Sequence, residues 1–199
     1  MLLVAFFTSF QLSVLAQDSI KVPAKAAFVG EPLKDSLMLN QKYYLLLQGN
    51  VMQSKATDKG KVKLLDSVMI RVLNETDFVL ATRYSKKGNC EIKLPLNKKF
   101  TIEFSKPGYV SKIVAINTGV PKYEMFINVF PFDIDLFEEI AGLDVEVLRE
   151  PIAKITYNNF NKTFDYDYNY TVKINNNIKK LYSEYYRLQK AQKERLEKE

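Results

Sequence analysis

Short runs in which apolar and polar residues alternate are the feature that most constrains the fold of this chain. The clearest run is residues 100–105, where Phe100, Ile102 and Phe104 are separated by polar side chains. Because successive side chains of a strand point to opposite faces, this run predicts a strand with one buried face. Six more runs, rich in β-branched and aromatic residues, cover residues 43–52, 68–73, 78–84, 90–94, 110–116 and 123–130. The pattern predicts a mainly β, antiparallel domain of seven strands.

Turn sequences separate these runs. Residues 74–77 (Asn-Glu-Thr-Asp) are typical of a turn held by an Asn or Asp side chain, and residues 86–89 supply the glycine of a tight hairpin. Residues 106–109 (Lys-Pro-Gly-Tyr) fit a type II turn, in which proline precedes a glycine at positive φ. The hairpin places Cys90 on the same face as Ile92 and Leu94, which favours a buried structural thiol over a reactive one.

Composition excludes several classes of function. The 199 residues include 29 Lys and Arg against 23 Asp and Glu, no His and one Cys. Catalytic triads that use histidine, histidine-ligated metals and intramolecular disulfides are therefore ruled out. The net charge of +6 is spread along a chain richer in Lys than in Arg, so nucleic acid is not expected as a partner. No apolar run reaches the ~20 residues of a membrane-spanning helix, so no span is expected in the mature chain.

The first 16 residues, MLLVAFFTSFQLSVLA, carry no charge and precede Gln17 and Asp18. This pattern predicts a signal peptide, with small residues at the cleavage site, although no Lys or Arg precedes the apolar run. A buried N-terminal strand is the alternative. The signal peptide predicts an exported protein, in the periplasm or associated with the outer membrane, and residues 17–42, which contain Pro23 and Pro32, are interpreted as a leader.

Four spaced segments resemble a carboxypeptidase regulatory-like domain. They are Leu-Gln-Gly-Asn-Val at 47–51, Asp-Ser-Val-Met-Ile-Arg-Val at 66–72, the hairpin at 81–92 and Phe-Ser-Lys-Pro-Gly-Tyr at 104–109. The resemblance covers residues 43–132 and implies a transthyretin-like seven-stranded sandwich without catalytic residues. In Gram-negative envelope proteins such domains serve as accessory or interaction modules. Two features depart from the family: a longer, more basic connection between the first two strands, and Asn89-Cys90 after the hairpin glycine.

The last predicted strand of the sandwich is apolar on both faces, which is unusual for a strand beside solvent. One face carries Met125, Ile127 and Val129, and the other carries Phe126, Phe130 and Phe132. Two explanations remain open. The segment after Phe132 folds back over the exposed face, or a partner protein covers it.

Residues 133–171 form an aromatic-rich extension. Its acidic residues, among them Asp133 and Asp135, do not have the spacing of a calcium-binding loop, so no metal or cofactor is predicted. A strand is expected at residues 152–157. Further on, Phe164, Tyr166, Tyr168 and Tyr170 share one face if residues 163–170 are extended. Such a row either packs within the protein or offers a platform on which a glycan could stack.

Residues 172–199 contain no Pro or Gly and predict an amphipathic helix. Its apolar stripe consists of Ile174, Ile178, Leu181, Tyr185 and Leu188. Three roles for the helix remain open: packing on its own β domain, association with a partner or a second copy, and contact of its Lys and Arg side chains with an anionic surface.

These patterns together predict an exported, non-catalytic interaction or assembly module of the cell envelope with an envelope protein as its partner. The alternative is a protein that binds peptidoglycan or another glycan. The candidate interaction surface comprises Phe164, Tyr166, Tyr168, Tyr170, Ile174, Ile178, Leu181, Tyr185 and Leu188. An aromatic-lined groove with converging carboxylates would favour glycan binding, whereas a flat apolar patch would favour assembly.

Overall fold

The computed structural model describes residues 41–54 and 63–198, which belong to one compact unit, Glu31–Glu199. The predicted signal peptide and nearly all of the predicted leader lie outside the described residues. The elements are β1 (Tyr44–Gln53), β2 (Lys63–Leu64), β3 (Met69–Leu73), β4 (Val79–Tyr84), β5 (Asn89–Pro95), β6 (Lys99–Ser105), β7 (Lys112–Asn117), η2 (Lys122–Glu124), β8 (Asn128–Pro131), β9 (Ile134–Leu136), η3 (Glu146–Arg149), β10 (Ala153–Asn158), β11 (Thr163–Tyr166) and α1 (Tyr168–Leu196).

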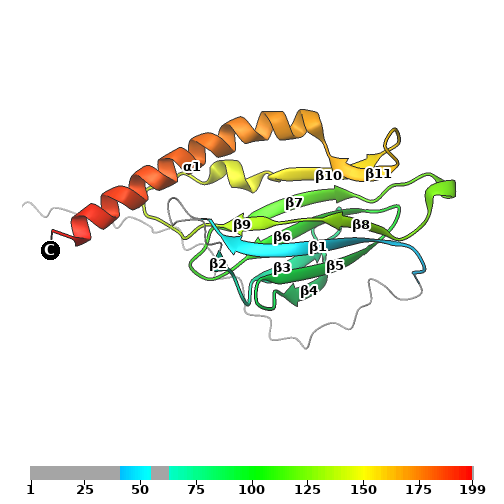
Figure 1. The fold of residues 1–199 in the computed structure, drawn as a ribbon, viewed down its shortest axis with the longest axis horizontal. Helices are drawn as coiled ribbons and strands as arrows, with labels where there is room; N and C mark the ends of the chain where they lie inside the picture. Colours follow the sequence, from blue (N-terminus) through cyan, green and yellow to red (C-terminus); the bar gives the residue numbers. More distant parts are fainter. Residues whose placement is uncertain (1–40, 55–62, 199) are drawn as a thin grey trace, which may run out of the picture. The chain divides into compact units, whose positions relative to one another are not determined.

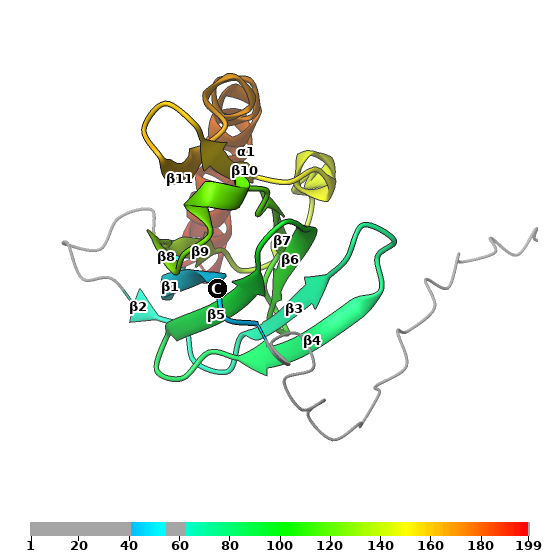
Figure 2. The same cartoon turned by 90° about the vertical axis from the view of Figure 1, so that its right-hand side faces the viewer.

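The described residues form two sheets that face each other across one apolar core (Figures 1 and 2). One sheet has the strand order β11-β10-β7-β6-β3-β4. The other is built on β1, which pairs with β5 and β2 on one side and with β8 and β9 on the other. The prediction of a mainly β sandwich with a C-terminal helix is confirmed.

The alternating runs supply the core. In β5 the side chains of Cys90, Ile92 and Leu94 are buried while those between them are exposed, and β6 repeats this pattern. Leu45 and Leu47 of β1, which lies beside β5, join the β5 side chains, and together they meet those of β6 from the other sheet in the core. The predicted burial of Cys90 is confirmed, since only 5% of its surface is exposed.

The predicted turns also form. The amide of Tyr109 donates to the carbonyl of Lys106 over 3.0 Å, and Gly108 has a φ of 78°, as a type II turn requires. The side chain of Asn74 accepts hydrogen bonds from the amides of Thr76 and Phe78 and closes the β3–β4 turn. Turn chemistry is local, and for this reason the sequence alone predicts it well.

The strand count and the pairing directions differ from the seven-stranded antiparallel prediction. β8 and β9 run parallel to β1, and β10 runs parallel to β7, so both sheets are mixed. The residues predicted as an extension thus add β10 and β11 to the six-stranded sheet. Apolar alternation indicates which face of a strand is buried, but it carries no information about which strand lies beside it.

The seventh predicted strand, residues 123–130, is wrong in its first half. Residues 122–124 form the short helix η2, and extended pairing begins only at Asn128. Pro121 precedes η2 and lacks an amide hydrogen, which fits a helical start better than a continuing strand. Phe130 and Phe132 then enter the sandwich core.

The helix α1 begins four residues earlier than predicted. Asp167 is its N-cap, and its carboxylate accepts a hydrogen bond from the amide of Tyr170 over 3.0 Å. β11 therefore ends at Tyr166. The residues predicted as one long strand, 163–170, are divided between a strand and a helix.

Candidate functional site

The apolar stripe of α1 packs on its own chain. Ile174, Leu181 and Tyr185 are buried, and Leu181 and Tyr185 join a small core with Phe137 and Leu148. The rings of Phe137 and Tyr185 lie 4.8 Å apart. Packing on the β domain is therefore the role of this stripe, and its buried members do not belong to a surface open to a partner in the described structure.

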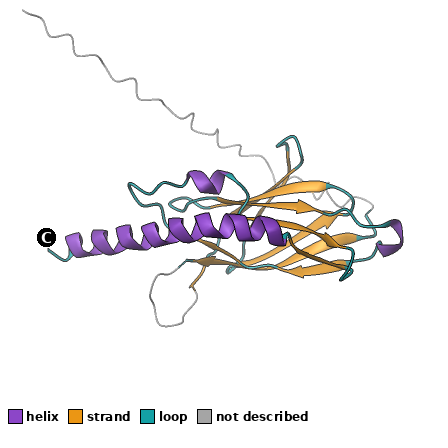
Figure 3. Cartoon of the chain, turned by 90° about the horizontal axis from the view of Figure 1, so that it is seen from above, coloured by secondary structure: helices purple, strands orange, loops and turns teal. Residues whose placement is uncertain are grey.

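The remaining predicted stripe residues, Ile178 and Leu188, are partly buried. The charged side chains that follow them are solvent-exposed. Figure 3 shows α1 running along the strands, with its last turns extending past them. The helix is thus anchored by its first two thirds and free in its last third.

The predicted row of four aromatic side chains does not form one platform. Phe164 is buried against Tyr157, with ring centroids 5.4 Å apart, and Tyr166 lies edge-on to Phe130 at 5.3 Å. The other two side chains belong to the helix, because the cap at Asp167 ends the extended segment. Tyr168 is exposed, and the hydroxyl of Tyr170 donates to the carbonyl of Pro151 over 2.6 Å.

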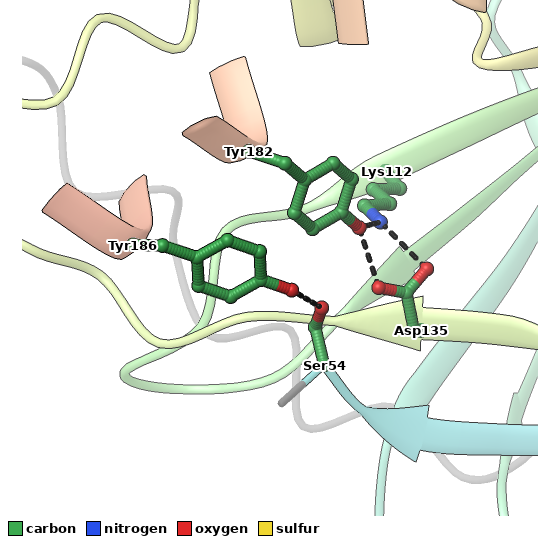
Figure 4. A network of polar contacts seen from close by, with 5 residues as sticks. All are labelled: Ser54, Lys112, Asp135, Tyr182 and Tyr186. Carbon is green, nitrogen blue, oxygen red and sulfur yellow. Dashed lines mark hydrogen bonds and ion pairs between the residues drawn. The ribbon is translucent and has the colours of Figure 1, made fainter. Parts of the chain in front are cut away.

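A buried polar network fastens α1 to the sandwich (Figure 4). The ammonium of Lys112 on β7 lies 3.0 Å from the carboxylate of Asp135 on β9 and donates to the hydroxyl of Tyr182 on α1 over 2.5 Å. The Tyr182 hydroxyl donates in turn to Asp135 over 2.5 Å. Beside this triangle, the hydroxyls of Ser54 and Tyr186 lie 3.4 Å apart. Three strands and the helix therefore meet at one set of hydrogen bonds.

Burial sets the electrostatics of this network. It lowers the pKa of Lys112, and the carboxylate of Asp135 opposes that shift. Burial alone would raise the pKa of Asp135, but Lys112 and hydrogen bonds from Tyr182 and Ser54 hold the pKa below its usual value. Burial and the neighbouring carboxylate raise the pKa of Tyr182, so its phenol stays protonated and remains a donor.

The Lys112 end of the network is enclosed, whereas the side chain of Asp135 remains 38% exposed. The side chain of Lys112 is only 2% exposed, and it lies 5.0 Å from the ring of Tyr182 and 5.5 Å from that of Phe137. Neither surface depression described below is lined by Lys112, Asp135 or Tyr182. The geometry of the Lys112–Asp135–Tyr182 network suits a structural role that holds the helix α1 against the sandwich.

Sequence reasoning missed this network, although one signal was present. Lys112 lies on the same face of β7 as the buried side chains of Val114 and Ile116. A cation at a core position calls for a buried counter-charge. Its partners could not be found in this way, because Asp135 and Tyr182 lie 23 and 70 positions further along the chain.

A second group of side chains is apolar and exposed, and we term it the exposed apolar surface. It comes from the segments around η2–β8 and β10–β11 and comprises Tyr123, Met125, Phe126, Ile127, Val129, Phe160, Tyr166 and Tyr168. Their exposed fractions range from 37% for Met125 to 94% for Phe160. Of the predicted interaction residues, only Tyr166 and Tyr168 belong to it.

Two contacts hold these segments together. The ammonium of Lys162, in the β10–β11 turn, lies 3.1 Å from the carboxylate of Glu124 in η2. The contact between Tyr166 and Phe130 joins β11 to β8. The exposed apolar surface therefore gathers on neighbouring segments at one side of the sandwich.

This surface answers the question left open by the apolar residues 125–129. The segment after Phe132 does not cover Met125, Phe126, Ile127 or Val129, all of which remain exposed among the described residues. Instead that segment continues as β9 beside β1 and then packs beneath α1. The explanation by folding back is wrong for these four side chains.

A shallow depression lies elsewhere, between η3 and the start of β7. It has a volume of about 610 Å³ and is lined by aliphatic side chains such as Ile140 and Leu143 together with Glu139, Asp144 and Glu146. No aromatic side chain lines it. It therefore lacks the stacking surface expected of a glycan-binding groove.

No group of three or more His, Cys, Asp or Glu residues in ranges 41–54 and 63–198 could hold a metal ion. Within the same ranges, no helix combines the length and the apolar character needed to cross a membrane.

Comparison with known proteins adds little. No protein-family model matches the chain, and no curated protein matches it. Among solved structures, the Bacillus anthracis TIE protein is 15% identical over 47% of this chain and 18% of its own, with a TM-score of 0.35. The crystal structure of S.CueP is 14% identical over 47% of this chain and 61% of its own, with a TM-score of 0.32. Less than two thirds of either protein is covered, so conclusions about function rest on the chain's own residues.

Proposed function

We propose that this protein is an exported, non-catalytic interaction module that docks to a protein of the cell envelope through its exposed apolar surface. The signal-peptide pattern of residues 1–16 supports export to the periplasm or the outer membrane. The resemblance of residues 43–132 to carboxypeptidase regulatory-like domains supports an accessory role. A resemblance of this kind concerns the fold, so the argument for docking comes from the surface itself.

The observation that carries the proposal is the exposure of the η2–β8 and β10–β11 side chains. Phe160 is 94% exposed at the tip of a turn whose backbone is fixed by the side chain of Asn158. Large apolar side chains gathered on neighbouring segments are a mark of protein docking sites, whereas scattered ones are ordinary. Aromatic side chains at such sites often supply most of the binding energy.

Catalysis and glycan binding receive less support. In the Lys112–Asp135–Tyr182 network the ammonium is enclosed and already paired with the carboxylate, which suits a structural role better than a catalytic one. The aromatic row that suggested glycan binding is divided between core, strand and helix. The exposed apolar surface is the feature that favours assembly over glycan binding.

The proposal can be tested by affinity capture from solubilised envelope with the full chain as bait. A variant with Tyr123→Ser, Ile127→Ser and Phe160→Ser removes three exposed side chains. We expect it to lose a captured protein, reducing recovery at least tenfold, because each truncation at a docking centre costs about 1–2 kcal/mol.

A control variant carries Phe78→Ser and Tyr84→Ser, whose side chains are also exposed, at 66% and 61%, but lie at the β4 edge. It is expected to retain the partner. Equal capture by both variants would refute docking through this surface. If the native chain and the triple variant both co-sediment with purified peptidoglycan to the same extent, the result would instead support the glycan alternative.

A further inference from the structure

Two shallow depressions beside the middle of α1 share Asp144 in their linings. We term them together the groove, and their aliphatic side chains its floor. Its larger part, about 610 Å³, has Ile140, Leu143 and Leu148 in its lining, and its smaller part, about 250 Å³, includes Leu181 of α1. Asp144 lines both parts. The lining of the groove thus combines aliphatic and charged side chains.

The charge of this groove is opposite to that of the chain. Four carboxylates line its two parts, from Glu139, Asp144, Glu146 and Glu184. Glu146 is paired with Arg149 and Glu184 with Arg187, which leaves Glu139 and Asp144 without a cation among the described residues. The chain as a whole carries a net charge of +6. Within the described residues the side chain of Glu139 has no hydrogen bond or ion pair. The groove is therefore suited to a segment that is both basic and apolar.

The last third of α1 is such a segment, and we term residues 187–198 the tail. Tyr185 is the last buried side chain of the helix. The tail carries five cations, Arg187, Lys190, Lys193, Arg195 and Lys198, against two carboxylates, Glu194 and Glu197. It also carries Leu188 and Leu196, the second of which is 66% exposed. Isolated helical ends without packing are only marginally stable in water, so a docking site would stabilise the tail.

The tail cannot occupy the groove of its own molecule. Lys180, Leu181 and Glu184 of the same continuous helix line the smaller part of the groove. A straight helix carries its later residues away from the site that its middle borders. At 1.5 Å per residue, the helical part of the tail, residues 187–196, extends over about 15 Å, which is long enough to lie along a groove on another molecule.

We propose that the groove binds the tail of a second copy of this chain. Glu139 and Asp144 face the tail cations, and Leu188 and Leu196 lie on the apolar floor. Reciprocal exchange of tails about a two-fold axis gives a closed dimer. Arg187 stays bound to Glu184 of its own helix, at 2.6 Å, whereas the pairs of Lys190 with Glu194 and of Lys193 with Glu197, both at 3.9 Å, are solvent-exposed and weak. Lys190 and Lys193 therefore yield readily to the new contacts.

This inference concerns a different surface from the proposed docking site and can be tested separately. Sedimentation equilibrium of the full chain should show a dimer whose dissociation constant rises at least tenfold between 0.05 and 0.5 M NaCl, since charge pairs are screened by salt. Glu139→Lys should weaken the dimer at least tenfold. Glu91→Lys is the matched control, because it makes the same change in charge at an exposed position of β5 and should leave the dimer unchanged.

A charge exchange gives the strictest test. A chain with Lys190→Glu and Lys193→Glu should not dimerise alone, but it should associate with the Glu139→Lys chain, whose groove now carries the complementary charge. A chain that stays monomeric at all concentrations would overturn the proposal. A second result would also overturn it: a dimer that is unaffected by salt and by Glu139→Lys but is lost in the variant with Tyr123→Ser, Ile127→Ser and Phe160→Ser. Such a dimer would form through the exposed apolar surface.

Discussion

Among the glycines of the described structure, Gly49 has the least room for a side chain. It lies in β1 where the neighbouring backbone passes from β8 to β9, and an added Cβ would stand 1.5 Å from the carbonyl oxygen of Phe132. The obstacle is backbone, which cannot rotate away. We expect Gly49→Ala to lower the free energy of unfolding by more than about 4 kcal/mol, or to prevent folding. Urea denaturation followed by circular dichroism measures this.

Gly108→Ala is the control for that experiment. Gly108 has a φ of 78° but no atom within 4 Å of the added Cβ, so only the backbone conformation is penalised. Its cost should be about 1–2 kcal/mol. Equal losses in the two variants would show that close approach at Gly49 is unimportant.

Cys90 is expected to be chemically inert in the folded protein. Burial, with a smaller effect of Asp133, raises the pKa of its thiol to about 11. At pH 8 about one molecule in a thousand then carries the reactive thiolate, and the side chain is also shielded. A disulfide reagent such as DTNB should label the native chain only as fast as it unfolds. Complete labelling within minutes in native buffer would contradict the predicted burial.

At the residue scale, the sequence predicts inward-facing side chains better than their partners. Ile92, Leu94 and Phe104 are buried as alternation predicts. Lys112 breaks the pattern, because a charged residue occupies a core position and its counter-charge comes from a distant strand. Pairing of this kind depends on the tertiary fold, which local periodicity does not encode.

At the scale of elements, the Lys112–Asp135–Tyr182 network makes α1 part of the sandwich. Asp135→Asn leaves the buried ammonium without its counter-charge and should cost about 3–5 kcal/mol, measured by urea denaturation. Tyr182→Phe removes two hydrogen bonds and should cost about 1–3 kcal/mol. The double variant Lys112→Met with Asp135→Leu removes both charges together and should cost less than Asp135→Asn alone. If the double variant is less stable than Asp135→Asn, the result would contradict the interpretation that Lys112 and Asp135 act as a charge pair.

The same network predicts sensitivity to acid. The pKa of Asp135 lies below its ordinary value near 3.8 in the folded chain. The carboxylate of Asp135 therefore binds a proton more readily in the unfolded chain than in the folded chain. Its contribution to stability is present above the pKa of the unfolded chain and is lost as the pH falls through the pKa of the folded chain. The stability difference between the native chain and Asp135→Asn should shrink below pH 4. A difference that stays constant from pH 7 to pH 2 would contradict this.

Elements with local signals could be predicted from the sequence, and elements defined by neighbours could not. The hairpin before β5 and the helix α1 follow from turn residues and periodicity. The start of α1 was missed because alternating aromatic residues after Thr163 resemble a strand, while Asp167 acts as a cap. The short helix η2 was missed for a similar reason, since the apolar residues that follow it continue the pattern of a strand.

At the scale of the whole molecule, packing of α1 on the sandwich changes which surface is available to partners. The helix stripe is used internally, so the predicted interaction surface loses Leu181 and Tyr185 to the core. The apolar side chains of η2–β8 and β10–β11 remain exposed instead. The two apolar faces of residues 123–130 indicated this surface in the sequence. Whether those side chains stay exposed depends on the path of the chain after Phe132, which the sequence pattern does not give.

Site-specific photocrosslinking in the envelope of living cells tests the central claim most directly. A benzophenone amino acid would replace Ile127 or Phe160 on the exposed apolar surface, and Phe78 or Tyr84 at the β4 edge as controls. The account predicts that Ile127 and Phe160 form adducts with one and the same protein, and that the control positions do not. Absence of adducts at Ile127 and Phe160, or the same adducts at all four positions, would contradict docking through this surface.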